Sequence, residues 1–185
     1  MTARRPLIPL VLLAATAVTL GGCAVMMRGR VGNRSVPEPA KTVDLNRYVG
    51  LWYEIGRYEN WFERGCEAAT AEYRARDSGV VQVINTCRTG SLNGPTKVAV
   101  GRAKVVAGSG NAKLKVSFFG PFYFGDYWVL DHDPDYAWSI VGEPSGRYLW
   151  LLSRTAEPSA ETREVIDARV RELGYDMSLI RRTQH

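Results

Sequence analysis

Lys113-Leu114-Lys115-Val116-Ser117-Phe118 is the stretch that decides the fold class, because polar and apolar residues alternate along it. Successive side chains of a β-strand point to opposite faces of the sheet, so a repeat of two residues is typical of a half-buried strand. The two lysines are expected to face water. Leu114, Val116 and Phe118 are then expected to face the protein interior.

Short strand-like runs separated by turn residues extend in both directions from this stretch. The predicted strands are residues 51–57, 68–76, 80–88, 97–106, 113–119, 127–131, 136–141 and 147–154. Their short connections favour antiparallel neighbours, because a parallel pair of strands needs a long crossover. Eight such strands predict an all-β fold, either a barrel or a sandwich of two sheets.

The last predicted strand is apolar on both faces, so both faces need cover. Tyr148, Trp150 and Leu152 share one face with Arg154, and we expect this face to look into the barrel. The other face is expected to lie beneath a helix.

A single amphipathic helix is predicted after Pro158, with Ser159 as its N-cap. Ile166, Val170 and Leu173 form one narrow apolar stripe along it. Gly174 stands where a C-terminal cap belongs. Residues 177–180 are expected to add a last short strand.

The N-terminus has the layout of a secretory signal, with Arg4 and Arg5 followed by an apolar run over residues 7–18. Leu20-Gly21-Gly22-Cys23 then resembles the lipobox of bacterial lipoproteins, although a chance cysteine after an ordinary signal is the alternative. The resemblance implies lipidation of Cys23, and several acyl chains make a stable membrane anchor. Ala24, in the position where lipoproteins of the inner membrane tend to carry Asp, favours the bacterial outer membrane.

These features divide the chain into three parts. Residues 1–22 are predicted to be a cleaved lipoprotein signal peptide, residues 23–43 a lipidated N-terminus with a flexible tether, and residues 44–185 the folded domain. The tether is predicted from small, basic and proline residues that show no periodicity. The two signal arginines leave with the signal, so the formal charge of +5 falls to about +3, which is too mild to indicate nucleic-acid binding.

Two of the three cysteines remain once Cys23 is assigned to the lipid anchor. Cys66 and Cys87 lie near the open end of a predicted hairpin in an oxidising compartment, and we expect them to form a disulfide if a bulge or loop adjusts the register. Two free thiols are the alternative.

Three sequence elements, taken in order, resemble the signature of the lipocalin family. Gly50-Leu51-Trp52-Tyr53 matches G-x-W-[YF], Gly125-Asp126-Tyr127 matches T-D-Y with Gly in place of Thr, and Arg154 stands at the arginine that ends the eighth strand. Residues 44–181 resemble the bacterial branch of the family. The resemblance implies an eight-stranded antiparallel up-and-down β-barrel with one C-terminal α-helix packed outside. It also implies that Arg154 stacks on Trp52.

The same resemblance implies a hydrophobic ligand, either a fatty acid or a lysophospholipid, that is stored or transported in the bacterial envelope. The residues expected to line the cavity are Leu114, Val116, Phe118, Trp138, Tyr148 and Trp150. Tyr53 is a further candidate. No cofactor is implied, and the sequence neither supports nor excludes a homodimer.

Two other classes of function remain open. One is a structural or interaction lipoprotein whose barrel is packed shut, and the other is an enzyme that uses Cys66 or Cys87 as a cavity nucleophile. No catalytic residue is assigned, because His132 stands in a predicted turn and is expected at the surface. No metal-ligand spacing occurs in the sequence.

Overall fold

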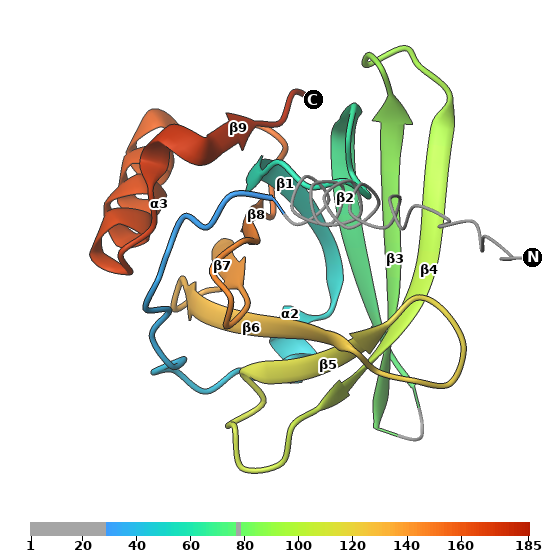
Figure 1. Ribbon diagram of the computed structural model, residues 1–185, viewed down its shortest axis with the longest axis vertical. Coiled ribbons are helices and arrows are strands. Elements are labelled where there is room, and N and C mark those ends of the chain that lie inside the picture. The colour runs from blue at the N-terminus through green and yellow to red at the C-terminus, as the bar shows by residue number, and fades with distance from the viewer. Residues whose placement is uncertain (1–28, 77–78) are drawn as a thin grey trace, which may run out of the picture.

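The computed structural model describes residues 29–76 and 79–185 of the chain. Its strands form one nine-stranded antiparallel sheet in the order β2-β3-β4-β5-β6-β7-β8-β1-β9 (Figure 1). Pairing of β1 with β2 closes the first eight strands into a barrel. The strands are β1 (Gly50–Tyr58), β2 (Cys66–Ala75), β3 (Val80–Thr89), β4 (Thr96–Val105), β5 (Lys113–Ser117), β6 (Gly125–His132), β7 (Trp138–Gly142), β8 (Leu149–Ser153) and β9 (Ile180–Arg182). The predicted barrel is confirmed, and the sandwich is not formed.

The ninth strand, β9, is not part of the closed eight-stranded barrel. It pairs with the second half of β1. Gly56 is opposite Arg182, and Tyr58 is opposite Ile180. A short 3-10 turn, Met177–Leu179, precedes this strand, so the last strand begins at the end of the range expected from the sequence. A second short element, the helix α2 (Leu45–Tyr48), was not predicted, and Asp44 caps it by accepting a hydrogen bond from the Asn46 amide.

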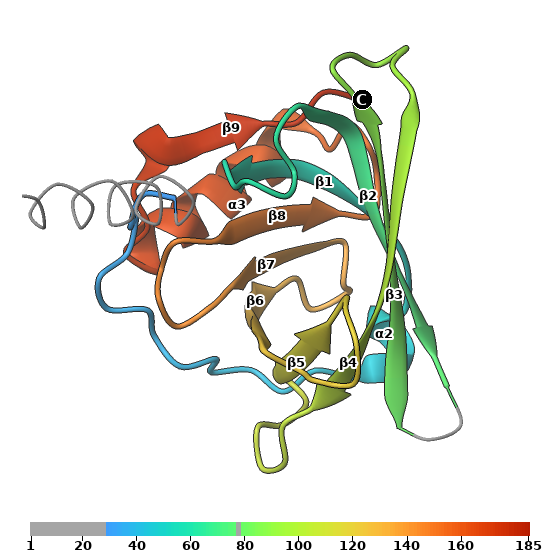
Figure 2. The same cartoon turned by 45° about the vertical axis from the view of Figure 1, so that its right-hand side comes forward.

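Two apolar cores lie on the two faces of the sheet. The inner core, inside the barrel, includes Trp52, Leu114 and Leu152. The outer core lies between the sheet and α3 (Ala160–Glu172), which packs against the outside of the barrel (Figure 2). Ser159 caps α3 as predicted, and Ile166, Val170 and Leu173 belong to the outer core. Alternation along β8 separates the two cores, since Leu152 faces inward whereas Leu149 and Leu151 lie beneath the helix.

Residues 29–43 lie against the barrel, whereas their composition predicts a flexible tether. The Asn33 side chain is buried and donates a hydrogen bond to the Leu173 carbonyl at 2.8 Å. Lys41 forms an ion pair with the buried Asp131 at 2.6 Å. This segment passes around the outside of the barrel to reach α2 (Figure 2). Backbone and side-chain hydrogen bonds hold residues 29–43 in place, although their sequence shows no periodic apolar pattern.

Cys66 and Cys87 form the predicted disulfide, with their Cα atoms 5.4 Å apart. Cys66 stands opposite Thr89 in the ladder, and an irregularity between Glu67 and Thr70 shifts the register of β2 against β3. The bulge that the pairing required is therefore present. The bond adds a covalent link between two strands that are already paired through backbone hydrogen bonds.

The outer core gives a direct test of how much α3 stabilises the fold. Ile166 is fully buried on the face of α3 that packs against the barrel, whereas its neighbour Val165 is 48% exposed. We expect Ile166→Ala to lower the free energy of unfolding in urea by about 2–5 kcal/mol, because it leaves a cavity. Val165→Ala is the matched control and should change that energy by less than about 0.5 kcal/mol. Equal effects of the two variants would contradict the packing described.

Candidate functional site

Arg154 closes one end of the barrel. Its guanidinium carbon lies 3.8 Å from the centroid of the Trp52 ring, and it donates hydrogen bonds to the carbonyls of Leu51 and Arg47, both at 2.7 Å. Trp52 is fully buried, and its indole N–H donates to the Tyr48 carbonyl at 2.8 Å. One side chain therefore ties the end of β8 to α2 and to the start of β1.

The first glycine of the signature, Gly50, has a φ of +95°, a conformation that favours glycine. A Cβ atom there would also lie 3.5 Å from the Arg154 guanidinium. The backbone turn between α2 and β1 thus brings Trp52 beneath Arg154.

The turn between β6 and β7 completes this closed end. The Tyr136 hydroxyl accepts a hydrogen bond from the Asp44 amide at 2.8 Å, and its ring stacks on His132 with centroids 4.4 Å apart. His132 is buried, so the expectation of a surface histidine is wrong. Its Nε2 lies 3.1 Å from the carbonyl oxygen of Thr42, in the N-terminal segment that covers this turn. The sequence of the turn alone could not predict that the N-terminal segment packs over it.

The residues matched to T-D-Y lie elsewhere, at the start of β6. Asp126 forms an ion pair with Lys115 on the neighbouring strand at 2.6 Å. Gly125 faces Val116, and a Cβ atom at Gly125 would lie 2.5 Å from a Val116 methyl group. The local reason for glycine at this position is therefore the close approach of Val116.

Three tyrosine hydroxyls form a polar cluster inside the closed half of the barrel. The Tyr127 hydroxyl lies 2.8 Å from that of Tyr73 and 3.0 Å from that of Tyr48, which also contacts the Ser139 hydroxyl at 3.0 Å. Burial raises the pKa of Tyr48 to about 12, and it also raises the pKa of Tyr73 and of Tyr127. The three hydroxyls thus stay protonated and satisfy one another by hydrogen bonding.

The wall of the barrel above this cluster is apolar. Leu114 is buried in the inner core, and Val116 and Phe118 pack against it while remaining partly exposed. Phe118 lies over Gly101, where a Cβ atom would be 2.8 Å from the ring. The three residues predicted from the alternating stretch therefore share the inner face.

Trp150 and Tyr148 lie together toward the open end. Their rings are stacked, with centroids 5.8 Å apart and an interplanar angle of 8°. Phe62, from the loop between β1 and β2, lies 6.4 Å from the Trp150 ring and 5.8 Å from the Tyr148 ring, centroid to centroid. These aromatic side chains line the approach to the barrel interior.

Trp138 does not line the interior, and that prediction is wrong. It belongs to the outer core beneath α3. On β7 the inward positions are taken by Ser139, which contacts Tyr48, and by Val141 of the inner core, so the two-residue repeat turns Trp138 outward. Tyr53 likewise packs edge-on against His185 at 5.4 Å, away from the inner core.

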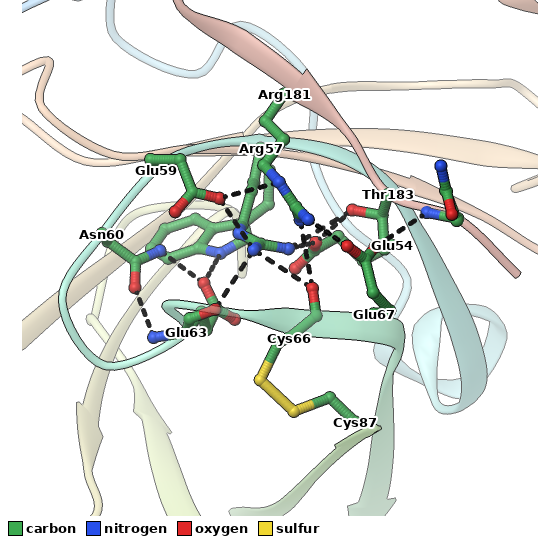
Figure 3. A network of polar contacts seen from close by, with 12 residues as sticks. Glu54, Arg57, Glu59, Asn60, Glu63, Cys66, Glu67, Cys87, Arg181 and Thr183 are labelled. Carbon is green, nitrogen blue, oxygen red and sulfur yellow. Dashed lines mark hydrogen bonds and ion pairs between the residues drawn. A yellow bond between two sulfur atoms is a disulfide. The ribbon is translucent and has the colours of Figure 1, made fainter. Parts of the chain in front are cut away.

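A network of charged side chains surrounds Arg57 near the open end (Figure 3). Arg57 is fully buried. It donates to the carboxylates of Glu54 at 2.7 Å and Glu59 at 2.8 Å, and to the carbonyls of Glu63 at 3.1 Å and Cys66 at 3.2 Å. A buried guanidinium needs such partners, because an unpaired buried charge is strongly destabilising.

Glu63 joins this network to the aromatic wall. Its carboxylate accepts a hydrogen bond from the Trp150 indole N–H at 2.9 Å and another from the Asn60 side chain. The carboxylates of Glu54 and Glu59 contact the Arg57 guanidinium, and that of Glu63 acts on it electrostatically. Arg181 forms a second ion pair with Glu59 at 3.3 Å. The polar end of the interior therefore carries an excess of negative charge when all three are ionised.

Within this network, the Glu54 carboxyl group has a pKa far from its ordinary value. Burial and the neighbouring Glu63 raise its pKa to about 7, although Arg57 and a hydrogen bond from Thr183 at 2.5 Å oppose the shift. Burial by itself lowers the pKa of Arg57, but Glu54, Glu63 and Glu59 outweigh this and raise it. Arg57 therefore stays charged, whereas Glu54 changes its charge near neutral pH.

This network was not predicted from the sequence, although one of its residues lies in a recognisable pattern. The two-residue repeat that turns Trp52 inward also turns Glu54 inward. Arg57 could not be found in this way, because an irregularity between Glu54 and Gly56 changes the register of β1 against β8 and places Arg57 opposite Trp150.

The enzyme alternative loses its nucleophile in this geometry. Both candidate cysteines are held in the Cys66–Cys87 disulfide, so neither offers a free thiol. The arrangement that remains is an apolar interior with a tyrosine cluster at one end and a charged network at the other. Such a surface suits binding of a hydrophobic molecule that has a polar end.

Comparison with known proteins identifies the family. Residues 43–185 match the Lipocalin-like domain. The chain belongs to the lipocalin family. It is 42% identical to the outer membrane lipoprotein Blc of Vibrio cholerae over 164 residues, which cover 86% of this chain and 93% of that protein. It is 38% identical to the outer membrane lipoprotein Blc of Escherichia coli K12 over 178 residues, 93% of each chain.

Solved lipocalin structures share the fold. Insecticyanin from the tobacco hornworm matches with a TM-score of 0.68 and 20% sequence identity, over 84% of this chain and 88% of that one. The bacterial relatives place this lipocalin in the outer membrane as a lipid-anchored protein. Cys23, the expected site of the anchor, lies outside the described residues.

Removal of the Arg154 side chain tests the closed end. Arg154→Ala loses a cation–π contact and hydrogen bonds to several carbonyls, and we expect it to destabilise the fold by about 2 kcal/mol and to lower Tm by several degrees. Calorimetry measures the melting temperature, and titration with a fluorescent fatty acid measures ligand affinity, which should change little. A large loss of affinity at an unchanged Tm would contradict a purely structural role.

Glu54 makes the stability depend on pH in a defined direction. Its pKa is about 7 in the folded protein and has an ordinary value of 4.5. Between these values the unfolded chain loses a proton that the folded protein keeps. The contribution of protonated Glu54 to the free energy of unfolding is therefore full below pH 4.5 and is lost as the pH rises through 7. Relative to Glu54→Gln, the wild type should gain free energy of unfolding as the pH falls from 8 to 5. A constant difference in urea titrations across this range would refute the assignment.

Proposed function

We propose that this lipocalin binds the acyl chain of a fatty acid or lysophospholipid inside its barrel and stores or transports it in the bacterial outer envelope. The function proposed is binding, not catalysis. It rests on one observation above others: apolar side chains of the inner face remain partly exposed although the sheet closes around them. These side chains are Ala71, Val105, Val116, Phe118, Tyr127 and Trp150.

An acyl chain would cover this exposed apolar surface. Each Å² of apolar area removed from water contributes about 25 cal/mol, so a long chain supplies most of the binding energy through contact with the wall. The polar end of the ligand would lie beyond the stacked rings of Trp150 and Tyr148 at the open end, where water reaches it. The tyrosine hydroxyls at the other end already pair with one another, so the terminal methyl group would meet no unsatisfied donor.

The anchor proposed for this function is the lipidated Cys23. Removal of residues 1–22 would leave this cysteine as the first residue of the mature chain. Anchoring keeps a carrier close to the membrane from which its ligand comes, so encounter takes place at high local concentration.

Native mass spectrometry followed by lipid extraction tests the proposal. Protein carrying Cys23→Ser is purified from the periplasm, with Trp150→Ala and Trp128→Ala as paired variants. Trp150 contacts the inner core, whereas Trp128 packs against the outer core, and both are partly buried. We expect a co-purified fatty acid or lysophospholipid in the parent protein and in Trp128→Ala. In Trp150→Ala the bound fraction should fall several-fold, because part of the wall is lost.

An empty parent protein that also fails to bind added lipids would overturn the proposal. It would favour the alternative of a closed barrel that acts as a structural or interaction lipoprotein. Equal loss of ligand in both tryptophan variants would show that general destabilisation, rather than loss of the inner wall, releases the lipid.

A further inference from the structure

Large aromatic side chains are exposed on the loops at the open end of the barrel. Phe119, Phe122 and Phe124, between β5 and β6, are 86%, 62% and 82% exposed. Trp61, between β1 and β2, is 53% exposed. In an up-and-down barrel these two loops lie at the same end, opposite the end that Arg154 closes. Exposed aromatic side chains concentrated at one end mark a surface of interaction.

One of these loops continues the aromatic wall of the interior to the outside. The Phe62 ring lies 6.4 Å from Trp150 on its inner side and 5.5 Å from Trp61 on its outer side, between centroids. Lys97, at the start of β4, holds the loop by donating to the Phe62 carbonyl at 2.7 Å. An apolar molecule that enters at Trp61 would therefore meet aromatic rings along its path to Trp150.

The N-terminal segment meets the barrel at this same end. The Gly29 carbonyl accepts a hydrogen bond from Arg147 at 2.8 Å, and the Gly32 amide donates to the Gly146 carbonyl at 2.9 Å. Both partners belong to the connection between β7 and β8. A Cβ atom at Gly29 would lie 3.5 Å from the carbonyl oxygen of Glu59, at the start of the loop that carries Trp61.

The length of chain between the anchor and Gly29 limits the distance from the membrane. Only six residue-to-residue steps separate Cys23 from Gly29, and even a fully extended chain spans no more than about 20 Å over six steps. A lipid anchor at Cys23 would thus hold the open end, not the closed end, close to the bilayer. Arg30, which is exposed beside this point, suits contact with anionic head groups.

We propose that the open end of the barrel docks on the membrane that holds the anchor, with the aromatic loops 59–65 and 118–124 in contact with the lipid. The bilayer is then both the docking partner and the source of the ligand. This inference rests on the proposed anchor at Cys23, but it does not require that the barrel bind a particular lipid. A second copy of the chain would be the other way to cover the same aromatics, and the test below separates the two.

Hydroxyl-radical footprinting with mass spectrometry tests the docking on the full lipidated protein in vesicles of phosphatidylethanolamine and phosphatidylglycerol. The unanchored Cys23→Ser protein in buffer is the reference. We expect oxidation of Trp61, Phe122 and Phe124 to fall several-fold on vesicles. Leu51, near the closed end, and Val165, on α3, are 43% and 48% exposed and should react at the same rate in both samples.

Protection confined to one of the two loops, or protection that includes Leu51 and Val165, would overturn the docked orientation. Protection that appears in buffer and grows with protein concentration would instead show a dimer formed through these loops. Absence of acyl chains on Cys23 would also overturn the proposal, because no anchor would then hold the open end at the membrane.

A paired variant separates docking from ligand binding. Phe122 and Phe124 contact each other at 5.5 Å and are mostly exposed. Phe122→Ser with Phe124→Ser should slow uptake of a fluorescent lysophospholipid from vesicles several-fold and leave its affinity in solution unchanged. Val165→Ser is the control and should change neither quantity. Unchanged uptake by the paired variant would contradict docking. Failure of the parent protein to bind the lysophospholipid in solution would contradict the proposed function instead.

Discussion

The contact between Arg154 and Trp52 is the constraint on which the rest of the structure depends. A barrel made from one sheet needs its first and last strands joined, and this contact holds the end of β8 on the start of β1. The same guanidinium holds α2 by its carbonyl oxygens. The aromatic loops and the network around Arg57 lie toward the opposite end of the barrel.

The second constraint is electrostatic. Arg57 is fully buried, so it requires carboxylates close by. Glu54, Glu59 and Glu63 nevertheless outnumber Arg57 and Arg181, which leaves negative charge in a weakly screened environment. Glu54 relieves part of this charge by taking up a proton near neutral pH. The two ends of the interior therefore differ. One holds neutral tyrosine hydroxyls that pair with each other, and the other holds a charged network whose ionisation depends on pH.

Much of the fold could be predicted from the sequence because alternation and turn residues are local signals. These signals predicted the strands, the helix with its buried stripe, and the pairing of Cys66 with Cys87. Irregular backbone escaped prediction. The register change after Glu54 turns Arg57 inward, and the N-terminal segment that covers His132 shows no periodic apolar pattern. Trp138 was misplaced because the facing of a five-residue strand depends on its neighbours, here Tyr48 beneath Ser139.

The function proposed for this lipocalin requires that the inner wall between the tyrosine cluster and Trp150 hold an acyl chain. The most direct measurement is a crystal structure with a fatty acid brominated near the middle of its chain, in which anomalous scattering locates the bromine. We expect a bromine peak inside the barrel, between Tyr127 and Trp150. A bromine peak only on the outer surface, or an interior filled by repacked side chains, would contradict it.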